Sequence, residues 1–145
     1  MDIPKLLNDM IQTYIDSTGT PLVDLSAADG TKYYMDAMDL NLMVRNLIKN
    51  ALEASRVVPD AKVELVCVST ADNGLSIKVS DVGPALSDET FGKLAQPLNT
   101  TKIGGLGLGL SIVRLLAESY GGHVEFARRT PSGLSVTIVL PPASE

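Results

Sequence analysis

A glycine-rich segment directly ahead of a helical pattern is the strongest chemical signal in the chain. It reads Asn-Thr-Thr-Lys-Ile-Gly-Gly-Leu-Gly-Leu-Gly-Leu over residues 99–110. Closely spaced glycines leave backbone N–H groups accessible, and a helix start adds partial positive charge, so the segment can hold an anion. Lys102 adds a full charge at its entrance. A flexible hinge is the alternative, although this many glycines carry an ordering cost that a hinge seldom requires.

Two other phosphate-binding patterns do not fit the chain. The dinucleotide fingerprint would need a glycine at position 110, which is Leu110. The Walker pattern ends in Gly-Lys-Ser/Thr, whereas the only Gly-Lys pair, Gly92-Lys93, is followed by Leu94. The phosphate site expected here is therefore of another kind.

Two asparagines in the longest helical pattern suggest a cation site. Asn46 and Asn50 are four residues apart and share one helix face, and Glu53 follows on the same stripe. Amide oxygens ligate Mg²⁺ without placing full negative charge beside phosphates. For this helix taken alone, an ordinary solvated polar face is the favoured interpretation.

A carboxylate follows a predicted strand in the segment Ser-Asp-Val-Gly-Pro, residues 80–84. Asp81 at such a strand end can accept a hydrogen bond from an exocyclic amine such as that of adenine. Gly83 would let a planar group approach the backbone. A plain turn is the alternative, since this composition also suits one.

The bulk composition limits the classes of protein. The net charge is −5 and the pI about 4.8, which disfavours a general nucleic-acid partner because such binding needs clustered Lys and Arg. No apolar run approaches the roughly 20 residues of a membrane span, and no secretory signal is apparent. The chain is therefore expected to be soluble. Cys67 lies in the segment Val-Glu-Leu-Val-Cys-Val, where it alternates with the glutamate, so it is expected to face the core; it has no second cysteine to pair with.

Periodicity predicts the elements that position these residues. Helices are expected at residues 3–15, 37–55 and 110–120. Strands are expected at residues 22–25, 32–35, 62–70, 75–80, 124–128 and 134–140, the last four as two hairpins. Residues 81–109 show little periodicity, and a loop of that length is usually functional, often a lid. The pattern predicts one α+β domain over residues 1–145, a two-layer sandwich of a mostly antiparallel mixed sheet with about three helices on one face.

Together these segments resemble the ordered motifs of the GHKL superfamily, which includes gyrase, the heat-shock-90 chaperone, histidine kinases and mismatch-repair ATPases. Residues 46–54 resemble its N box, 81–84 its G1 box and 105–113 its G2 box. Residues 96–102 are similar to the Pro-Phe-Phe-Thr-Thr-Lys of one histidine-kinase branch, the nitrogen-regulation type. The chain is thus identified as similar to the ATP-binding catalytic domain of a sensor histidine kinase.

The resemblance implies a site for ATP and Mg²⁺. Asn50 would ligate the metal with Asn46 nearby, and Asp81 would read the adenine amino group while Gly83 leaves room for the ring. A lid over about residues 84–108 would bring further groups to the phosphates. These implied phosphate contacts are Thr101, Lys102, Gly105, Gly107, the amide of Leu108, and Gly109.

One position favours phosphotransfer over hydrolysis. ATP-hydrolysing relatives carry a glutamate four residues before the metal asparagine, and here that position is Asn46. The resemblance therefore implies donation of the γ-phosphoryl group to a histidine on a separate dimerisation domain, with a response regulator downstream. Two alternatives stay open: a degenerate nucleotide-binding regulatory module, suggested by departures at Ala85, Leu98 and Glu53, and an anti-sigma-type serine kinase.

The acceptor histidine is expected outside the chain. The only histidine, His123, begins a predicted strand without an apparent carboxylate partner and is interpreted as structural. No residue is assigned as certainly catalytic, and the chain is expected to be an excised domain that lacks an upstream sensor and dimerisation region. The domain is expected in the cytoplasm without direct membrane contact, and the resemblance leaves open a membrane anchor elsewhere in the parent protein.

Overall fold

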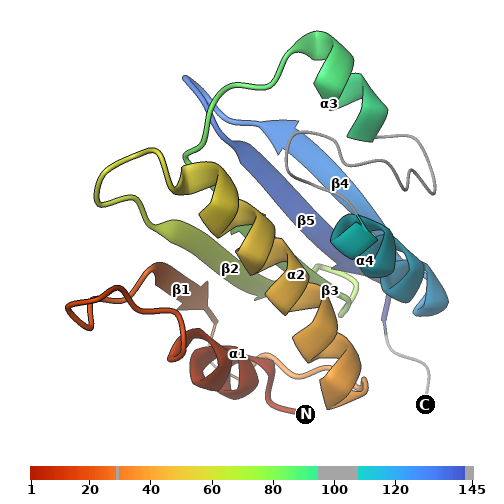
Figure 1. Ribbon diagram of the computed structural model, residues 1–145. Coiled ribbons are helices and arrows are strands. Elements are labelled where there is room, and N and C mark those ends of the chain that lie inside the picture. The colour runs from red at the N-terminus through yellow and green to blue at the C-terminus, as the bar shows by residue number, and fades with distance from the viewer. Residues whose placement is uncertain (29, 95–107, 143–145) are drawn as a thin grey trace.

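The computed structural model describes residues 1–28, 30–94 and 108–142. Figure 1 shows one sheet with helices packed against it. In chain order the elements are α1 (Ile3–Ile11), β1 (Val23–Ala27), α2 (Ala37–Ser55), β2 (Val63–Ser69), β3 (Leu75–Ser80), α3 (Asp88–Leu94), α4 (Leu108–Ser119), β4 (His123–Arg128) and β5 (Leu134–Leu140). In this part of the chain no helix has the length and apolarity needed to cross a membrane.

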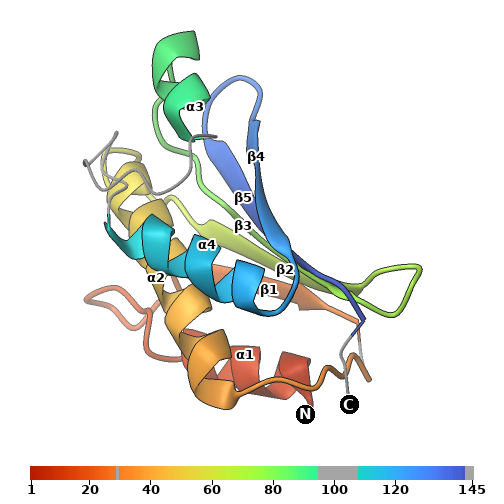
Figure 2. The ribbon, with the colours of Figure 1, turned by 90° about the vertical axis from the view of Figure 1, so that its right-hand side faces the viewer.

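The sheet has the strand order β1-β2-β3-β5-β4. β1 pairs with β2 in parallel, and the other neighbours are antiparallel. Helices α1, α2 and α4 cover one face, while the opposite face carries no helix from the described residues (Figure 2). The predicted α+β sandwich with a mostly antiparallel mixed sheet is confirmed.

The core lies between α2 and the covered sheet face. On α2 the fully buried residues recur at helical spacing, as with Met43, Val44 and Ile48. On β2 the alternate residues Val63, Leu65 and Cys67 are buried, which places Cys67 inside as predicted. Burial raises the pKa of the Cys67 thiol to about 11, so it stays protonated and unreactive. Because the apolar stripe of α2 faces the sheet, its asparagines lie on another side of the helix.

The strand predicted at residues 32–35 is wrong. The segment is extended but forms only an isolated bridge between Asp2 and Lys32. Tyr33 and Met35 are buried and Tyr34 is exposed, which produces a strand-like alternation without a sheet partner. The Tyr33 hydroxyl donates to the Pro141 carbonyl, so the alternation reflects packing near the chain's C-terminal end.

The first helix is shorter than predicted, because it ends at Ile11 rather than at residue 15. The Asp16 carboxylate accepts hydrogen bonds from the backbone N–H groups of Thr18 and Thr20, at 2.8 and 2.9 Å. Ile15 then forms a bridge with Pro21. A short polar side chain that hydrogen-bonds to nearby backbone N–H groups stabilises a turn in place of further helix, and here the Asp16 turn forms instead.

The segment 81–109, expected to be without regular structure, contains the short helix α3. The Ser87 hydroxyl accepts from the backbone N–H of Thr90 at 3.1 Å, as an N-terminal cap does. With seven residues, α3 is too short to show a helical period in sequence.

Candidate nucleotide-binding site

Helix α2 and the start of α4 meet at Asn46 and Gly109. A Cβ atom added to Gly109 would lie 2.5 Å from Asn46 Oδ1, closer than real side chains approach. Asn46 Nδ2 donates to the Leu42 carbonyl at 2.7 Å, which leaves Oδ1 facing Gly109. The predicted asparagine helix therefore lies against the end of the predicted glycine-rich segment.

Asn50 lies one helical turn beyond Asn46 and is half-buried. Its Nδ2 atom is buried and has no hydrogen-bond partner within the described ranges. A buried amide left unpaired costs about 1–3 kcal/mol, so this group is a candidate contact for a ligand. The two ends of an amide exchange by rotation, so either the oxygen or the nitrogen can be turned toward that partner.

Asp81 follows β3 and is 7% exposed. Its Oδ1 accepts from the backbone N–H of Gly83 at 2.9 Å and of Leu134 at 3.1 Å. Burial raises the pKa of Asp81 above its usual value, although these two hydrogen bonds and the Arg129 charge act in the opposite direction. Oδ2 accepts no hydrogen bond from any residue that the structure describes, so it is available to a ligand donor.

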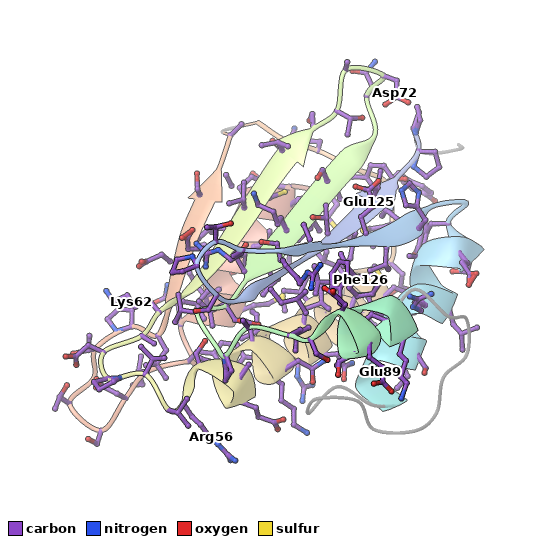
Figure 3. All side chains as sticks on the ribbon, turned by 90° about the horizontal axis from the view of Figure 1, so that it is seen from above. Arg56, Lys62, Asp72, Glu89, Glu125 and Phe126 are labelled. Atoms are coloured by element: carbon purple, nitrogen blue, oxygen red, sulfur yellow. The ribbon has the colours of Figure 1, made fainter. Side chains whose placement is uncertain are left out.

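A hollow of about 330 Å³ opens beside Asp81. Its walls come from the end of α2, the segment after β3 and the start of β5: Glu53, Ala54, Arg56, Val57, Asp81, Pro84, Leu86 and Leu134. Arg56 extends from this end of α2 in Figure 3. Apolar walls beside the Asp81 carboxylate suit a planar base that carries an amine.

Gly83 joins the Asp81 turn to α2. A Cβ on Gly83 would lie 2.6 Å from the Ala54 carbonyl oxygen and 2.9 Å from the Ala54 Cβ. Next to it, the Val82 N–H donates to the Ser55 hydroxyl at 3.1 Å. Helix α2 thus occupies the space that a side chain at position 83 would need. Gly83 therefore allows the turn to pack closely against α2, in addition to any room that it leaves for a base.

Several predicted site residues lie outside the described residues. These are Thr101, Lys102, Gly105 and Gly107, together with most of the predicted lid. Leu108 begins α4, with Gly109 following it. The structure therefore brings together the asparagine helix, the Asp81 turn and the helical end of the glycine-rich segment.

Two arginines hold α3, the helix that precedes the undescribed part of the predicted lid. Arg128 Nη1 lies 2.5 Å from Asp88 Oδ1, and its guanidinium lies 4.7 Å from the centre of the Phe91 ring. At the other end, Arg114 donates to the Leu94 carbonyl. α3 is therefore tied to both β4 and α4.

His123 has a carboxylate partner, contrary to the prediction. Its Nε2 lies 2.7 Å from Glu125 Oε2, because residues two apart on a strand share a face. Phe126 packs against the core, and Figure 3 shows Glu125 and Phe126 on opposite sides of β4. His123 and Glu125 therefore point to the open sheet face, away from Asn46.

Sequence reasoning missed two groups that support the Asp81 turn, Ser55 and Arg129. Ser55 could have been found as a buried polar residue at the end of an otherwise apolar helical stripe. Arg129 carried no local signal, because its contact with Asp81 depends on how β5 pairs with β3.

An α+β sandwich with a buried carboxylate, paired asparagines and a glycine at a helix start defines a nucleotide-binding domain. Residues 35–144 match the family model described as histidine kinase-, DNA gyrase B-, and HSP90-like ATPase. The chain therefore belongs to this ATPase family, and it is an ATP-binding domain of the histidine-kinase type.

Its relatives are sensor proteins of the kinase class. The chain is 34% identical over 112 residues to the C4-dicarboxylate transport sensor protein DctB of Rhizobium meliloti, covering 77% of this chain and 18% of that protein. It is 31% identical over 134 residues to a putative NtrY-like sensor histidine kinase of Rickettsia felis, covering 92% and 21%. The chain thus spans about a fifth of the length of these curated relatives.

Solved structures show the same fold. The catalytic domain of the histidine kinase ThkA aligns with a TM-score of 0.76 at 21% identity, covering 100% of this chain and 97% of that one. Full-length ShkA in complex with AMPPNP aligns with a TM-score of 0.76 at 20% identity, covering 100% and 31%. The first is a histidine-kinase catalytic domain, and the second holds AMPPNP, an ATP analogue.

Proposed function

We propose that this chain binds Mg-ATP and presents the γ-phosphoryl group to a histidine on a separate dimerisation domain of its parent protein. The observation that carries the proposal is the arrangement along α2. Asn46 and Asn50 stand in the middle of this helix, and Ala54 stands at its end beside the Asp81 hollow. Eight residues of helix span about 12 Å, a length suited to a nucleotide lying with its base at one end and its phosphates at the other.

Asp81 would select adenine. Its free Oδ2 would accept a hydrogen bond from the exocyclic amine while Oδ1 stays bound to two backbone N–H groups. Guanine carries a carbonyl oxygen at that position, which a carboxylate repels. A charged hydrogen bond of this kind corresponds to about tenfold to hundredfold in affinity.

The residues present fit a magnesium ion. Asn50, whose buried Nδ2 has no hydrogen-bond partner among the described residues, would hold it, and the Asn46 amide would lie close to the ion or its waters. Amide oxygens are suitable ligands for this cation, which would neutralise charge on the phosphate oxygens. Of this chain's own groups, Asn46 and Asn50 would orient that end of the nucleotide.

Asn46 favours transfer over hydrolysis. An amide cannot take a proton from an attacking water, and its Nδ2 is already bound to the Leu42 carbonyl. An acceptor that brings its own nucleophile avoids this requirement. A histidine on a dimerisation domain is such an acceptor, as the sensor-kinase relatives suggest.

The remaining contacts are proposals for the lid, about residues 84–108. Thr101, Lys102, Gly105 and Gly107, with the amide of Leu108 and Gly109, would enclose the triphosphate. Beyond the chain, a response regulator would receive the phosphoryl group from the histidine. The domain would work in the cytoplasm of the cell.

Calorimetric titration of the chain with ATP, with and without Mg²⁺, tests the first half of the proposal. Magnesium-dependent binding is expected, and an absence of binding heat with both ATP and ADP would overturn it. The second half needs the dimerisation domain of the parent protein. Acid-labile, alkali-stable phosphate on that domain is expected, whereas tight binding without it indicates a regulatory module, and phosphoserine on a partner indicates a serine kinase.

A further inference from the structure

Arg129 reaches Asp81 from behind the hollow. It lies in the turn after β4, and its Nη1 donates to the main-chain carbonyl of Asp81 at 2.7 Å. Its Nη2 lies 3.2 Å from Glu64 Oε1 on β2, so the guanidinium is held at two points. Arg129 is not among the residues that line the hollow, so it would act on a ligand through Asp81.

The rest of the turn also encloses Asp81. A Cβ on Gly133 would lie 2.3 Å from the Asp81 carbonyl oxygen, and Gly133 has a φ of +106°, which favours glycine. The Leu134 N–H donates to Asp81 Oδ1, and the Leu134 carbonyl accepts from the Asp81 N–H at 2.9 Å. The main chain and the carboxylate of Asp81 are therefore both fixed by the turn between β4 and β5.

Arg129 also supplies a favourable charge. Burial raises the pKa of the Asp81 carboxyl, and the Arg129 charge acts against that rise. A protonated carboxyl would lose part of its ability to accept from an amine and would no longer repel a carbonyl. The hydrogen bond from Arg129 therefore holds Asp81 in place, and the Arg129 charge favours the ionised carboxylate that accepts from an amine.

We propose that Arg129 is a positioning residue for nucleotide selection: by holding the Asp81 carbonyl and tying the β4–β5 turn to Glu64, it keeps the Asp81 carboxylate oriented to read adenine. This inference rests on the proposed ATP-binding function. It adds a residue outside the recognised motifs, on a strand end far from them in sequence.

The test uses the variants Arg129→Gln and Arg129→Lys, with Lys78→Gln as the matched control. Lys78 lies on β3 at a register position opposite Val66 and Thr137, so its loss removes the same charge from the sheet without touching Asp81. Affinities for Mg-ATP and Mg-GTP are measured from pH 5 to 8 by calorimetry. Each variant is compared with the parent chain at the same pH, which cancels titration of the nucleotide.

Arg129→Gln is expected to bind ATP about tenfold more weakly while GTP affinity changes little, so that the ATP/GTP ratio falls. Its loss of ATP affinity on acidification is expected to begin at a higher pH than in the parent chain. Arg129→Lys is expected to restore the parent pH profile, because it keeps the charge. Lys78→Gln is expected to match the parent in both ratio and profile.

An unchanged ATP/GTP ratio and pH profile in Arg129→Gln would overturn the inference. If that variant fails to fold, Glu64→Gln takes its place, and an unchanged ratio there counts equally against the inference, since Glu64 holds the other end of the guanidinium. Failure of the proposed function gives a different result: the parent chain itself would show no binding of ATP.

Discussion

Gly109 at the start of α4 lies directly against Asn46 in the middle of α2, where a Cβ would meet the Asn46 side-chain oxygen at 2.5 Å. Any larger residue at position 109 must push that amide aside or separate the two helices. The glycine therefore leaves the space that the asparagine side chain occupies, in addition to its proposed contact with a phosphate.

Gly109→Ala is expected to weaken Mg-ATP binding about tenfold, because the added methyl group displaces the Asn46 amide. The free energy of unfolding is expected to change by less than about 1 kcal/mol, since alanine's better helix propensity offsets the overpacking. Titration calorimetry and denaturant unfolding measure the two effects. Gly92→Ala on α3 is the control: its Cβ meets nothing within 4 Å, and it is expected to stabilise the chain slightly without loss of affinity.

Asn50→Leu is expected to stabilise the nucleotide-free chain while removing magnesium-dependent ATP binding. The buried Nδ2 of Asn50 has no partner in the described part of the chain, and replacing such an amide with an apolar group of similar size gains about 1 kcal/mol, or about 2–4 °C in melting temperature. Scanning calorimetry with and without Mg-ATP measures both effects. Asn41→Leu on the same helix is the comparison, and it is expected to retain binding. Full magnesium-dependent affinity in Asn50→Leu would contradict the assignment of Asn50.

Asp81→Asn is expected to raise the melting temperature of the nucleotide-free chain at pH 7 and to weaken ATP binding by tenfold or more. Burial raises the pKa of Asp81 in the folded state, so its protonation stabilises the fold at low pH, and that contribution is lost as the pH rises through the folded-state pKa. Asparagine keeps the neutral form at every pH. The gain in melting temperature should therefore shrink as the pH is lowered toward the usual pKa of aspartate, about 3.9. A gain that is constant with pH would show that ionisation of Asp81 is not its cause.

Gly83→Ala is expected to destabilise the chain by about 2 kcal/mol, because its Cβ would lie 2.6 Å from a backbone oxygen of α2. Unlike a flexible side chain, the Ala54 carbonyl cannot move without moving the helix. The same variant should lose ATP affinity, since the Asp81 turn is displaced from the hollow. Unfolding with urea measures the loss of stability. A decrease in the free energy of unfolding smaller than that caused by a surface substitution such as Lys62→Ala would be inconsistent with the close contact between Gly83 and the Ala54 carbonyl.

Local patterns were sufficient for the elements that carry strong periodicity. Helix α2 and the strands β3 and β5 have the predicted bounds, because each presents an uninterrupted helical or alternating apolar pattern. Residues 32–35 alternate equally well but have no strand beside them. An alternating apolar pattern shows that one side of a segment is buried, but it does not show whether another strand pairs with that segment.

In the site, too, local sequence patterns predicted some features, whereas others depend on segments that are distant in sequence. Asn46, Gly109 and Asp81 could be selected from residue type and spacing alone. The groups that fix them come from distant segments, as with the Leu134 N–H on Asp81 and the Arg129 guanidinium on its carbonyl. Those contacts depend on strand register, which only the assembled sheet defines. The Glu125 partner of His123 was two residues away and could have been found by strand geometry.

Helix α2 has one side in the apolar core and another along the proposed nucleotide site. A substitution that lets this helix rock on the sheet, even one as mild as Ile48→Val, would alter the spacing between Asn50 and the Asp81 turn without touching either. Nucleotide affinity should therefore respond to small changes in the packing between α2 and the sheet. Core variants of the sheet are expected to bind ATP weakly even where they remain folded.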